Sequence, residues 1–267
     1  QHKFGALDLI RAGLQDLDKA RTLFDELHND GIDDDRMRLL LTTLEKACDP
    51  DVALSNLVDI IKVVQSQGED FTNIIADENS FIRLITVLGV SDEMGKLMRF
   101  RPELVEAAAN DACESHLYNH EQRRAHVLKS VGADPNDHTM PTASLPLAEA
   151  ATALRKTYRK QLAAIMAQDA TANDPIEIQP RISTELSDLA DAALEGALAI
   201  ARHEVDGSEH VRFAIIGMGK LGAQELNYVS DVDLIYVVEP ADADTNGMTL
   251  SRIGTKMATT LQRVCQS

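Results

Sequence analysis

The spacing of apolar residues changes near residue 211, and this change decides which fold class the sequence predicts. Before it, apolar residues recur at steps of three and four, which is the period of an amphipathic helix. After it come two short apolar runs, 211–216 and 232–238, and the second is rich in β-branched residues. We therefore expect an α+β fold that is mostly α, in which a helical region is followed by a partial core with a mixed sheet.

Turn signals divide the helical region. The predicted helices cover about 6–28, 36–48, 52–65, 107–131, 147–168 and 183–203, and a last one starts near Leu250. The segment 133–145 is the best linker candidate, and Pro175 and Pro180 are expected in the loop between the two long helices. We expect three parts: an N-terminal helical region over 1–140, connecting long helices over 141–205 and a truncated core over 206–267.

The acidic composition limits the ligands of this chain. Its formal net charge is −17. A negative field repels phosphate backbones, so we expect no binding to nucleic acid. A single nucleotide is compatible with this charge, because a bound divalent cation reverses the local field.

The cysteines and the apolar runs indicate the compartment. Cys48, Cys113 and Cys265 are far apart and show no CxxC spacing, which argues against a disulfide framework and a structural zinc site. The sequence has no apolar run of about 18 residues and no charged-then-apolar leader, so it predicts neither a membrane span nor a signal peptide. We expect a cytoplasmic protein.

Two aspartates open the second predicted strand, directly after Ser230. Side chains at i and i+2 of a strand share a face, so Asp231 and Asp233 are expected to point the same way. Two like charges so close are costly unless a cation lies between them, and Mg²⁺ prefers carboxylate and phosphate oxygens. We therefore predict that both aspartates bind metal and are catalytic.

The first predicted strand ends in a glycine-rich turn. Gly217, Gly219 and Gly222 let the backbone approach a phosphate without interference from Cβ, and Lys220 neutralises part of the phosphate charge. Together with Ser230, these are the predicted nucleotide-binding residues. The turn and the Asp-x-Asp pair indicate the start of a metal-dependent nucleotidyltransferase core.

Two other interpretations fit parts of this segment. In the plainer one, Asp231 is a turn residue and Asp233 is the polar side of a half-exposed strand. In the other, the Gly-x-Gly-x-x-Gly pattern is a dinucleotide fingerprint with Glu239 as the ribose ligand. That fold needs a full helix and then a buried parallel strand, whereas only 223–226 looks helical and two carboxylates open the next strand.

Other candidate residues carry weaker signals. His120 and His126 are six positions apart, which is not the helix-face spacing of two metal ligands, so we expect surface or core histidines. Arg123-Arg124 and the group Arg155-Lys156 with Arg159-Lys160 are basic patches on helices. Such patches are mostly solvated faces, and only the second is a candidate for facing an anionic ligand.

The stretch 217–234, GMGKLGAQELNYVSDVDL, resembles the signature of the glutamine synthetase adenylyltransferase family. Three further segments are similar to helical parts of that family, namely 88–104, 154–169 and 186–191. The resemblance covers most of the chain and is strongest in its last 85 residues.

The resemblance implies a large bifunctional enzyme with two nucleotidyltransferase modules. One module attaches AMP to a tyrosine of glutamine synthetase, and the other removes it by phosphorolysis and releases ADP. The Glu225-Leu-Asn227-Tyr version of the motif looks more like the deadenylylating module, in the N-terminal half. Asp231 and Asp233 fall on the family's two metal-binding aspartates, and Gly219, Lys220, Gly222 and Ser230 fall on its glycine-turn motif.

The same resemblance implies that part of the site is missing. Family members hold two Mg²⁺ ions with a third carboxylate on a further strand, which would lie beyond Ser267. We therefore expect a fragment that has little or no activity alone.

The expected function is deadenylylation, with glutamine synthetase as protein substrate and ATP or ADP and phosphate as small-molecule partners. Two alternatives stay open: adenylyl transfer from ATP to the same tyrosine, and a non-catalytic helical module that docks glutamine synthetase or a PII signal protein. Neither nucleic acid nor a membrane is expected as a partner.

Overall fold

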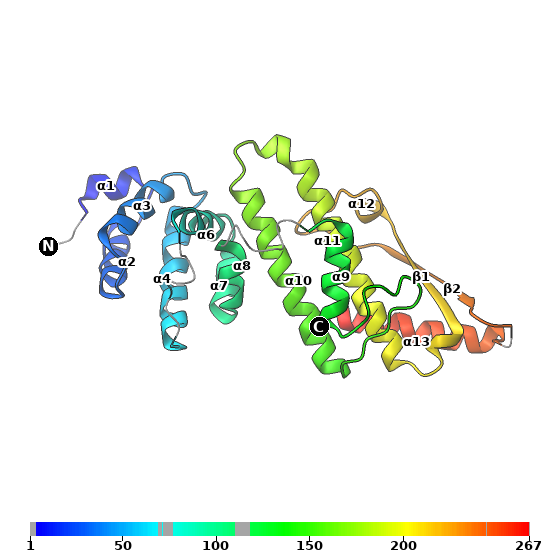
Figure 1. Ribbon diagram of the computed structural model, residues 1–267. Helices are drawn as coiled ribbons and strands as arrows, with labels where there is room; N and C mark the ends of the chain where they lie inside the picture. The colour runs from blue at the N-terminus through cyan, green and yellow to red at the C-terminus, as the bar shows by residue number, and fades with distance from the viewer. Residues whose placement is uncertain (1–3, 69–70, 72–76, 110–117, 244, 267) are drawn as a thin grey trace. The chain divides into compact units, whose positions relative to one another are not determined.

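The structure is a computed structural model that describes residues 4–68, 71, 77–109, 118–243 and 245–266. The chain divides into two compact units. Unit 1 comprises residues 1–116 and 163–175, and unit 2 comprises residues 117–162 and 176–267. Described helices dominate, and the strands form one small sheet, so the predicted α+β, mostly α fold class is confirmed (Figure 1).

Unit 1 is helical throughout its described residues. Its helices are α1 (Ala6–Arg11), α2 (Leu17–Asn29), α3 (Asp34–Leu44), α4 (Pro50–Ser66), α6 (Glu78–Val90), α7 (Asp92–Phe100) and α8 (Glu103–Ala109). The centre of the core is aliphatic: Leu57, Ile60 and Ile61 of α4 and Leu84 and Leu88 of α6 are at most 1% exposed. Burial of each such side chain contributes about 1.5–3 kcal/mol, which explains how a chain with few aromatics builds a core.

Polar side chains cap the first turns of most of these helices. Asp16, Asp33, Asp49, Asp77 and Ser91 each accept a hydrogen bond from the backbone N–H three residues further along. Each cap satisfies a donor that has no partner within the helix, and contributes about 1 kcal/mol. The caps therefore fix where these helices begin.

The single helix predicted over 6–28 is wrong. The chain forms α1 and α2 there, and Gly13 lies between them with φ +82°. That value is in the left-handed region, which glycine adopts without the steric cost of a Cβ. Asp16 then caps the new helix.

Two long helices belong partly to unit 2. They are α10 (Leu147–Ala170) and α11 (Pro175–Glu204). The prediction that Pro175 and Pro180 lie in a loop is wrong, because Pro175 is the first residue of α11 and Pro180 lies inside it. Proline fits the first helical position, where the missing N–H has no intrahelical partner to lose.

Unit 2 also contains α9 (His120–Ser130), the 3₁₀ helix η2 (Ser208–His210) and α13 (Gly247–Gln266). The helix predicted over 107–131 corresponds in part to α8 and α9, and its middle lies outside the described residues. The helix expected from Leu250 starts three residues earlier as α13.

The sheet of unit 2 consists of β1 (Val211–Gly217) and β2 (Leu234–Pro240), which pair antiparallel. The register places Phe213 opposite Val238 and Gly217 opposite Leu234. The sequence predicted a mixed sheet, which needs at least three strands. The described residues form a sheet of two strands. The antiparallel pairing also contradicts the dinucleotide-binding alternative, which requires a parallel strand after the glycine turn.

One face of this sheet packs on α13. The rings of Phe213 and Tyr236 contact each other at a tilt of 45°, with centroids 5.5 Å apart, and Met257 of α13 is fully buried. Gly254 allows the close approach, because a Cβ there would lie 2.9 Å from Cγ1 of Val238. The opposite face, which includes Ile235, is exposed.

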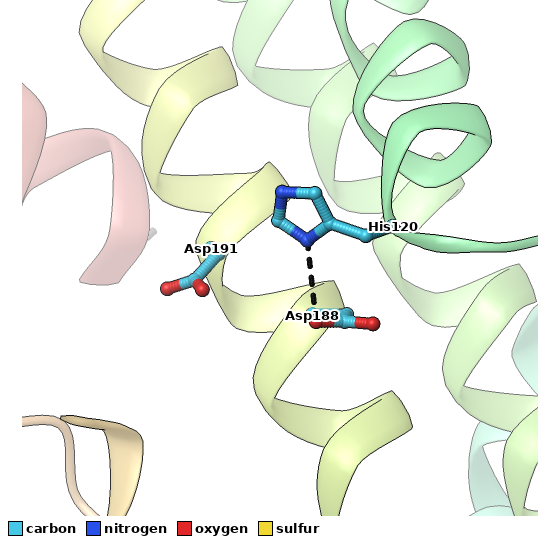
Figure 2. A group of neighbouring side chains, drawn as sticks. All are labelled: His120, Asp188 and Asp191. Atoms are coloured by element: carbon cyan, nitrogen blue, oxygen red, sulfur yellow. Dashed lines mark hydrogen bonds and ion pairs between the residues drawn. The ribbon is translucent and has the colours of Figure 1, made fainter. Parts of the chain in front are cut away.

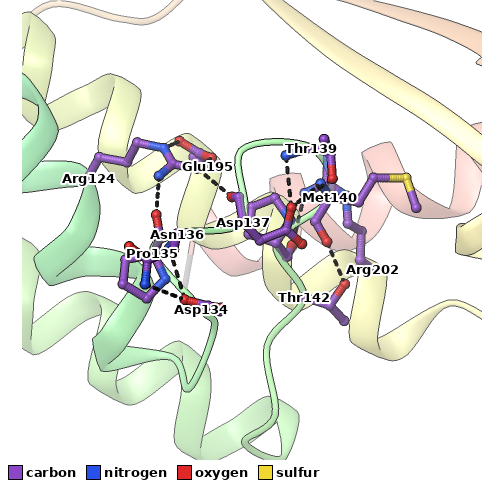
Figure 3. Close-up of polar contacts among 11 residues, drawn as sticks. Arg124, Asp134, Pro135, Asn136, Asp137, Thr139, Met140, Thr142, Glu195 and Arg202 are labelled. Atoms are coloured by element: carbon purple, nitrogen blue, oxygen red, sulfur yellow. Dashed lines mark hydrogen bonds and ion pairs between the residues drawn. The ribbon is translucent and has the colours of Figure 1, made fainter.

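The segment 133–145, the linker candidate, lies within unit 2 and is held by side chains of two helices (Figure 3). Arg124 of α9 donates to the carbonyl oxygens of Pro135 and Asp137, at 2.7 and 2.9 Å. Arg202 of α11 donates to the carbonyl oxygen of Pro141, at 2.9 Å. The loop is thus fixed in place at both ends.

The expectation that Arg123 and Arg124 form a solvated face is wrong. Arg123 is fully buried and donates to Glu185 at 2.9 Å, and burial lowers the pKa of its guanidinium. Arg124 is 8% exposed and donates to both carboxylate oxygens of Glu195, at 2.9 and 2.8 Å. Both glutamates lie on α11, so the two ion pairs join α9 to α11.

Two remaining expectations concern cysteines and membranes. Cys48 and Cys265 are free thiols, and Cys113 lies outside the described residues. None of the described helices combines the length and the apolar character that a membrane crossing needs.

Candidate functional site

The glycine turn connects β1 to α12 (Gly219–Gly222) and requires glycine at two positions. Gly219 has φ +54°, in the left-handed region. A Cβ at Gly222 would lie 2.5 Å from the carbonyl oxygen of Gly217, which is closer than any real contact. The backbone of the turn therefore folds tightly on itself and leaves no room for a side chain at Gly222, which is compatible with a turn that cradles a phosphate.

The two aspartates lie just before β2, which begins at Leu234 rather than at the predicted residue 232. The backbone N–H of Met218 donates to the carbonyl oxygen of Asp233 at 2.8 Å, which ties the turn to this segment. A Cβ at Gly219 would lie 3.2 Å from Oδ2 of Asp233. The carboxylate of Asp233 is therefore adjacent to the glycine turn.

Asp231, two residues before Asp233, lines a cavity of about 610 Å³ together with residues of α10, α11, β2 and α13. Asp231 and Asp233 are both exposed, and within the described part of the chain neither carboxylate has a hydrogen bond or an ion pair. Unengaged carboxylates such as these suit a divalent cation, which takes oxygen ligands.

The cavity lined by Asp231 is mainly apolar, with polar groups at separate points. Arg155 and Tyr158 of α10 and Gln262 of α13 contribute these groups. The Nε atom of Arg155 is buried and has no hydrogen-bond partner among the described residues, and burial raises the pKa of Tyr158. The sequence suggested the group Arg155-Lys156 with Arg159-Lys160 for an anionic ligand, and of these four residues Arg155 lines the same cavity as Asp231.

Ser230 and Lys220 are joined through a short polar loop. The hydroxyl of Ser230 donates to Oδ1 of Asn227 at 2.8 Å, and Nζ of Lys220 lies 3.5 Å from the Ser230 hydroxyl. The loop is anchored at Leu226, which is buried and whose N–H donates to the hydroxyl of Ser187 on α11 at 3.4 Å. The predicted residues Ser230 and Lys220 therefore lie in contact with each other. The sequence analysis did not identify Asn227, whose side chain accepts the hydrogen bond from Ser230.

A second cavity, of about 500 Å³, is lined by residues of the turn. Gly217, Gly222 and Gln224 line it from the turn, and His120 and Asp191 line it from α9 and α11. The arrangement could not be predicted from the sequence, because His120 lies 71 positions before Asp191 and 97 positions before Gly217.

A comparison with models of known protein families identifies the family of this chain. A family model described as glutamate-ammonia ligase adenylyltransferase matches residues 81–267. The chain belongs to this family. The resemblance stated from the sequence is confirmed, and the match includes the glycine turn, both aspartates and all of α11.

Curated members of the adenylyltransferase family match nearly the whole chain. One from Bifidobacterium longum (strain DJO10A) is 70% identical over 265 residues, which are 99% of this chain and 25% of the relative. One from Cutibacterium acnes is 35% identical over 98% of this chain and 26% of the relative. Both carry the name bifunctional glutamine synthetase adenylyltransferase/adenylyl-removing enzyme. The chain thus spans about a quarter of the length of these relatives.

Proposed function

We propose that this chain provides the nucleotidyl-transfer site that removes AMP from an adenylylated tyrosine of glutamine synthetase in the full-length enzyme. The observation that carries the proposal is the position of Asp233 directly beside Gly219, with Asp231 two residues away and both carboxylates unengaged within the described residues. The printed names of the relatives include both attachment and removal of adenylyl groups. The Glu225-Leu-Asn227-Tyr motif supports removal.

The reaction is a phosphorolysis. An oxygen of inorganic phosphate attacks the phosphorus of the AMP group, the bond from that phosphorus to the tyrosine oxygen breaks, and the tyrosine takes up a proton while ADP is released. Mg²⁺ bound by Asp231 and Asp233 would neutralise the charge that builds up on the phosphoryl oxygens. Both aspartates fit it, because they offer oxygen ligands that no other group occupies.

The other residues of the chain orient the phosphate groups. The tight turn at Gly217, Gly219 and Gly222 lets phosphate oxygens approach backbone N–H groups. Lys220 brings a positive charge, and its contact with Ser230 directs it toward the loop before the aspartates. Arg155 brings a second positive charge to the cavity that Asp231 lines.

Substitution of the two aspartates tests the proposal. In the full-length enzyme, we expect Asp231→Asn and Asp233→Asn each to reduce phosphate-dependent ADP release from adenylylated glutamine synthetase by about 100-fold or more, because several kcal/mol of charge stabilisation is lost. The matched control is Asp206→Asn, an exposed aspartate of unit 2. ADP release that both site variants retain at the control rate would overturn the proposal.

The chain alone should be nearly inactive. Within the described residues no third histidine, cysteine or carboxylate forms a three-ligand group with Asp231 and Asp233, and family members use a third carboxylate. Robust ADP release by the 267-residue chain would contradict this expectation. Docking of a PII signal protein and a cytoplasmic location remain predictions from the sequence.

A further inference from the structure

Three potential metal ligands from two helices meet at one place in unit 2. They are His120 at the start of α9 and Asp188 and Asp191 of α11, and one ligand atom of each lies within 4.8 Å of the other two. Figure 2 shows the imidazole above the two carboxylates, with Nδ1 of His120 3.2 Å from Oδ1 of Asp188. Asp188 and Asp191 are three positions apart, so they project from the same face of the helix.

Two buried ion pairs hold these helices on either side of the cluster. Arg123 of α9 pairs with Glu185, about one turn before Asp188, and Arg124 pairs with Glu195, about one turn after Asp191. Buried, hydrogen-bonded pairs of this kind fix geometry more strongly than surface pairs. The distance between His120 and the two aspartates is therefore set by the packing of α9 on α11, as a preorganised ligand site requires.

Two carboxylates meet in this cluster, and Arg123, the arginine that interacts electrostatically with Asp188, is already paired with Glu185. Asp188 contacts His120, but the carboxylate of Asp191 has no hydrogen bond or ion pair within the described residues. The arginines that line the adjoining cavity are already engaged, Arg124 with Glu195 and Arg202 with the carbonyl oxygen of Pro141.

We propose that His120, Asp188 and Asp191 bind a divalent transition-metal ion. One imidazole nitrogen and two carboxylate oxygens are ligands that Mn²⁺ and Zn²⁺ both accept. Ligand atoms that lie about 2.0–2.2 Å from an ion are roughly 3–4.4 Å from one another. The ligand atoms of these three side chains lie within 4.8 Å of one another, so a small shift of the side chains brings them to the distances that one ion requires. The exposed ring of His120 needs only a rotation to present its nitrogen.

Asp231 lines the larger cavity, whereas His120 and Asp191 line the smaller one, so the cluster does not share a cavity with Asp231. Three protein ligands leave coordination positions open, and the cavity that His120 and Asp191 line is also lined by Gly217 and Gly222. An ion held here would join the start of α9 to α11 next to the glycine turn. The assignment does not rest on the proposed reaction.

Electron paramagnetic resonance of bound Mn²⁺ tests the site in the full-length enzyme that carries Asp231→Asn and Asp233→Asn. We expect a ¹⁴N coupling from one imidazole, and we expect His120→Ala to abolish it while His138→Ala, an exposed control in the same unit, leaves it unchanged. Asp191→Asn should weaken Mn²⁺ binding about tenfold or more, because even supporting residues of metal sites are worth 10- to 100-fold.

Asp191→Asn is informative because it leaves the contact between His120 and Asp188 intact, so the fold is expected to persist. Thermal unfolding without metal checks this, and Mn²⁺ should raise the melting temperature of the starting protein but not of the Asp191→Asn variant. Absence of the ¹⁴N coupling, or equal Mn²⁺ affinity in the starting protein and the Asp191→Asn variant, would overturn the proposal. The cluster would then be an ordinary ion pair with a neighbouring aspartate.

Discussion

Single residues of the glycine turn are constrained by the backbone around them. Gly222 faces the carbonyl oxygen of Gly217 so closely that any side chain must displace the backbone. The approach of a phosphate to these glycines stays a prediction. The sequence pattern does not show where each aspartate side chain lies. The carboxylate of Asp233 lies beside Gly219, whereas Asp231 lines a cavity that helices distant in the sequence help to form.

Substitution of Gly222 by alanine measures this constraint. We expect Gly222→Ala to lower the free energy of unfolding by about 1–3 kcal/mol, because the added methyl overlaps backbone that cannot move away without strain. Chemical denaturation gives the value. Gly247→Ala is the control, since a Cβ there meets no atom within 4 Å. Equal effects of the two substitutions would contradict the proposed close approach.

A pH-dependent contact at the residue scale involves His210 and Asp242. Nδ1 of His210 lies 2.6 Å from Oδ2 of Asp242, and this hydrogen bond raises the pKa of His210 above its usual 6.5. The folded chain therefore binds this proton more tightly than the unfolded chain. The stabilisation is complete below pH 6.5 and is lost as the pH rises through the raised pKa.

An NMR titration of the His210 ring checks this direction. We expect Asp242→Asn to shift the midpoint downward, toward 6.5. An unchanged midpoint would show that Asp242 is not the cause of the raised pKa.

At the scale of helices and strands, local signals predicted much of the fold and distant contacts explain the errors. Asp49 and Pro50 mark the start of α4, close to the start of the helix predicted over 52–65, because a cap and a first-turn proline act within a few residues. The burial of Arg123 and Arg124 was not predictable, because their partners Glu185 and Glu195 are 62 and 71 positions away. No local pattern distinguishes an arginine that reaches such a partner from a solvated one.

The pairing of α9 with α11 gives a prediction about stability. We expect Arg124→Ala to cost about 3 kcal/mol, because it removes the partner of Glu195 and two contacts to the 133–145 loop. The value is at the low end for a buried pair, since the Glu195 side chain is 28% exposed. Denaturant unfolding measures it, with the exposed Lys160→Ala as control. A cost like that of the control would show that this pair does not hold the helices.

At the scale of the whole molecule, the chain consists of two units and spans about a quarter of its relatives. Unit 2 contains the glycine turn, both aspartates, both cavities and the His120 cluster, so the proposed chemistry belongs to this unit. The family could be recognised from one stretch, 217–234, because the residues predicted to bind phosphate and metal lie close together in the chain there. The His120 cluster could not, because folding alone brings its members together.

The most direct measurement follows both reactions in one full-length enzyme that carries Asp231→Asn and Asp233→Asn. Glutamine synthetase is supplied once with AMP attached, together with phosphate, and once unmodified, together with ATP. We predict that phosphate-dependent release of ADP is lost while attachment of AMP from ATP continues. Continued release of ADP at the wild-type rate would contradict the assignment of this site to AMP removal.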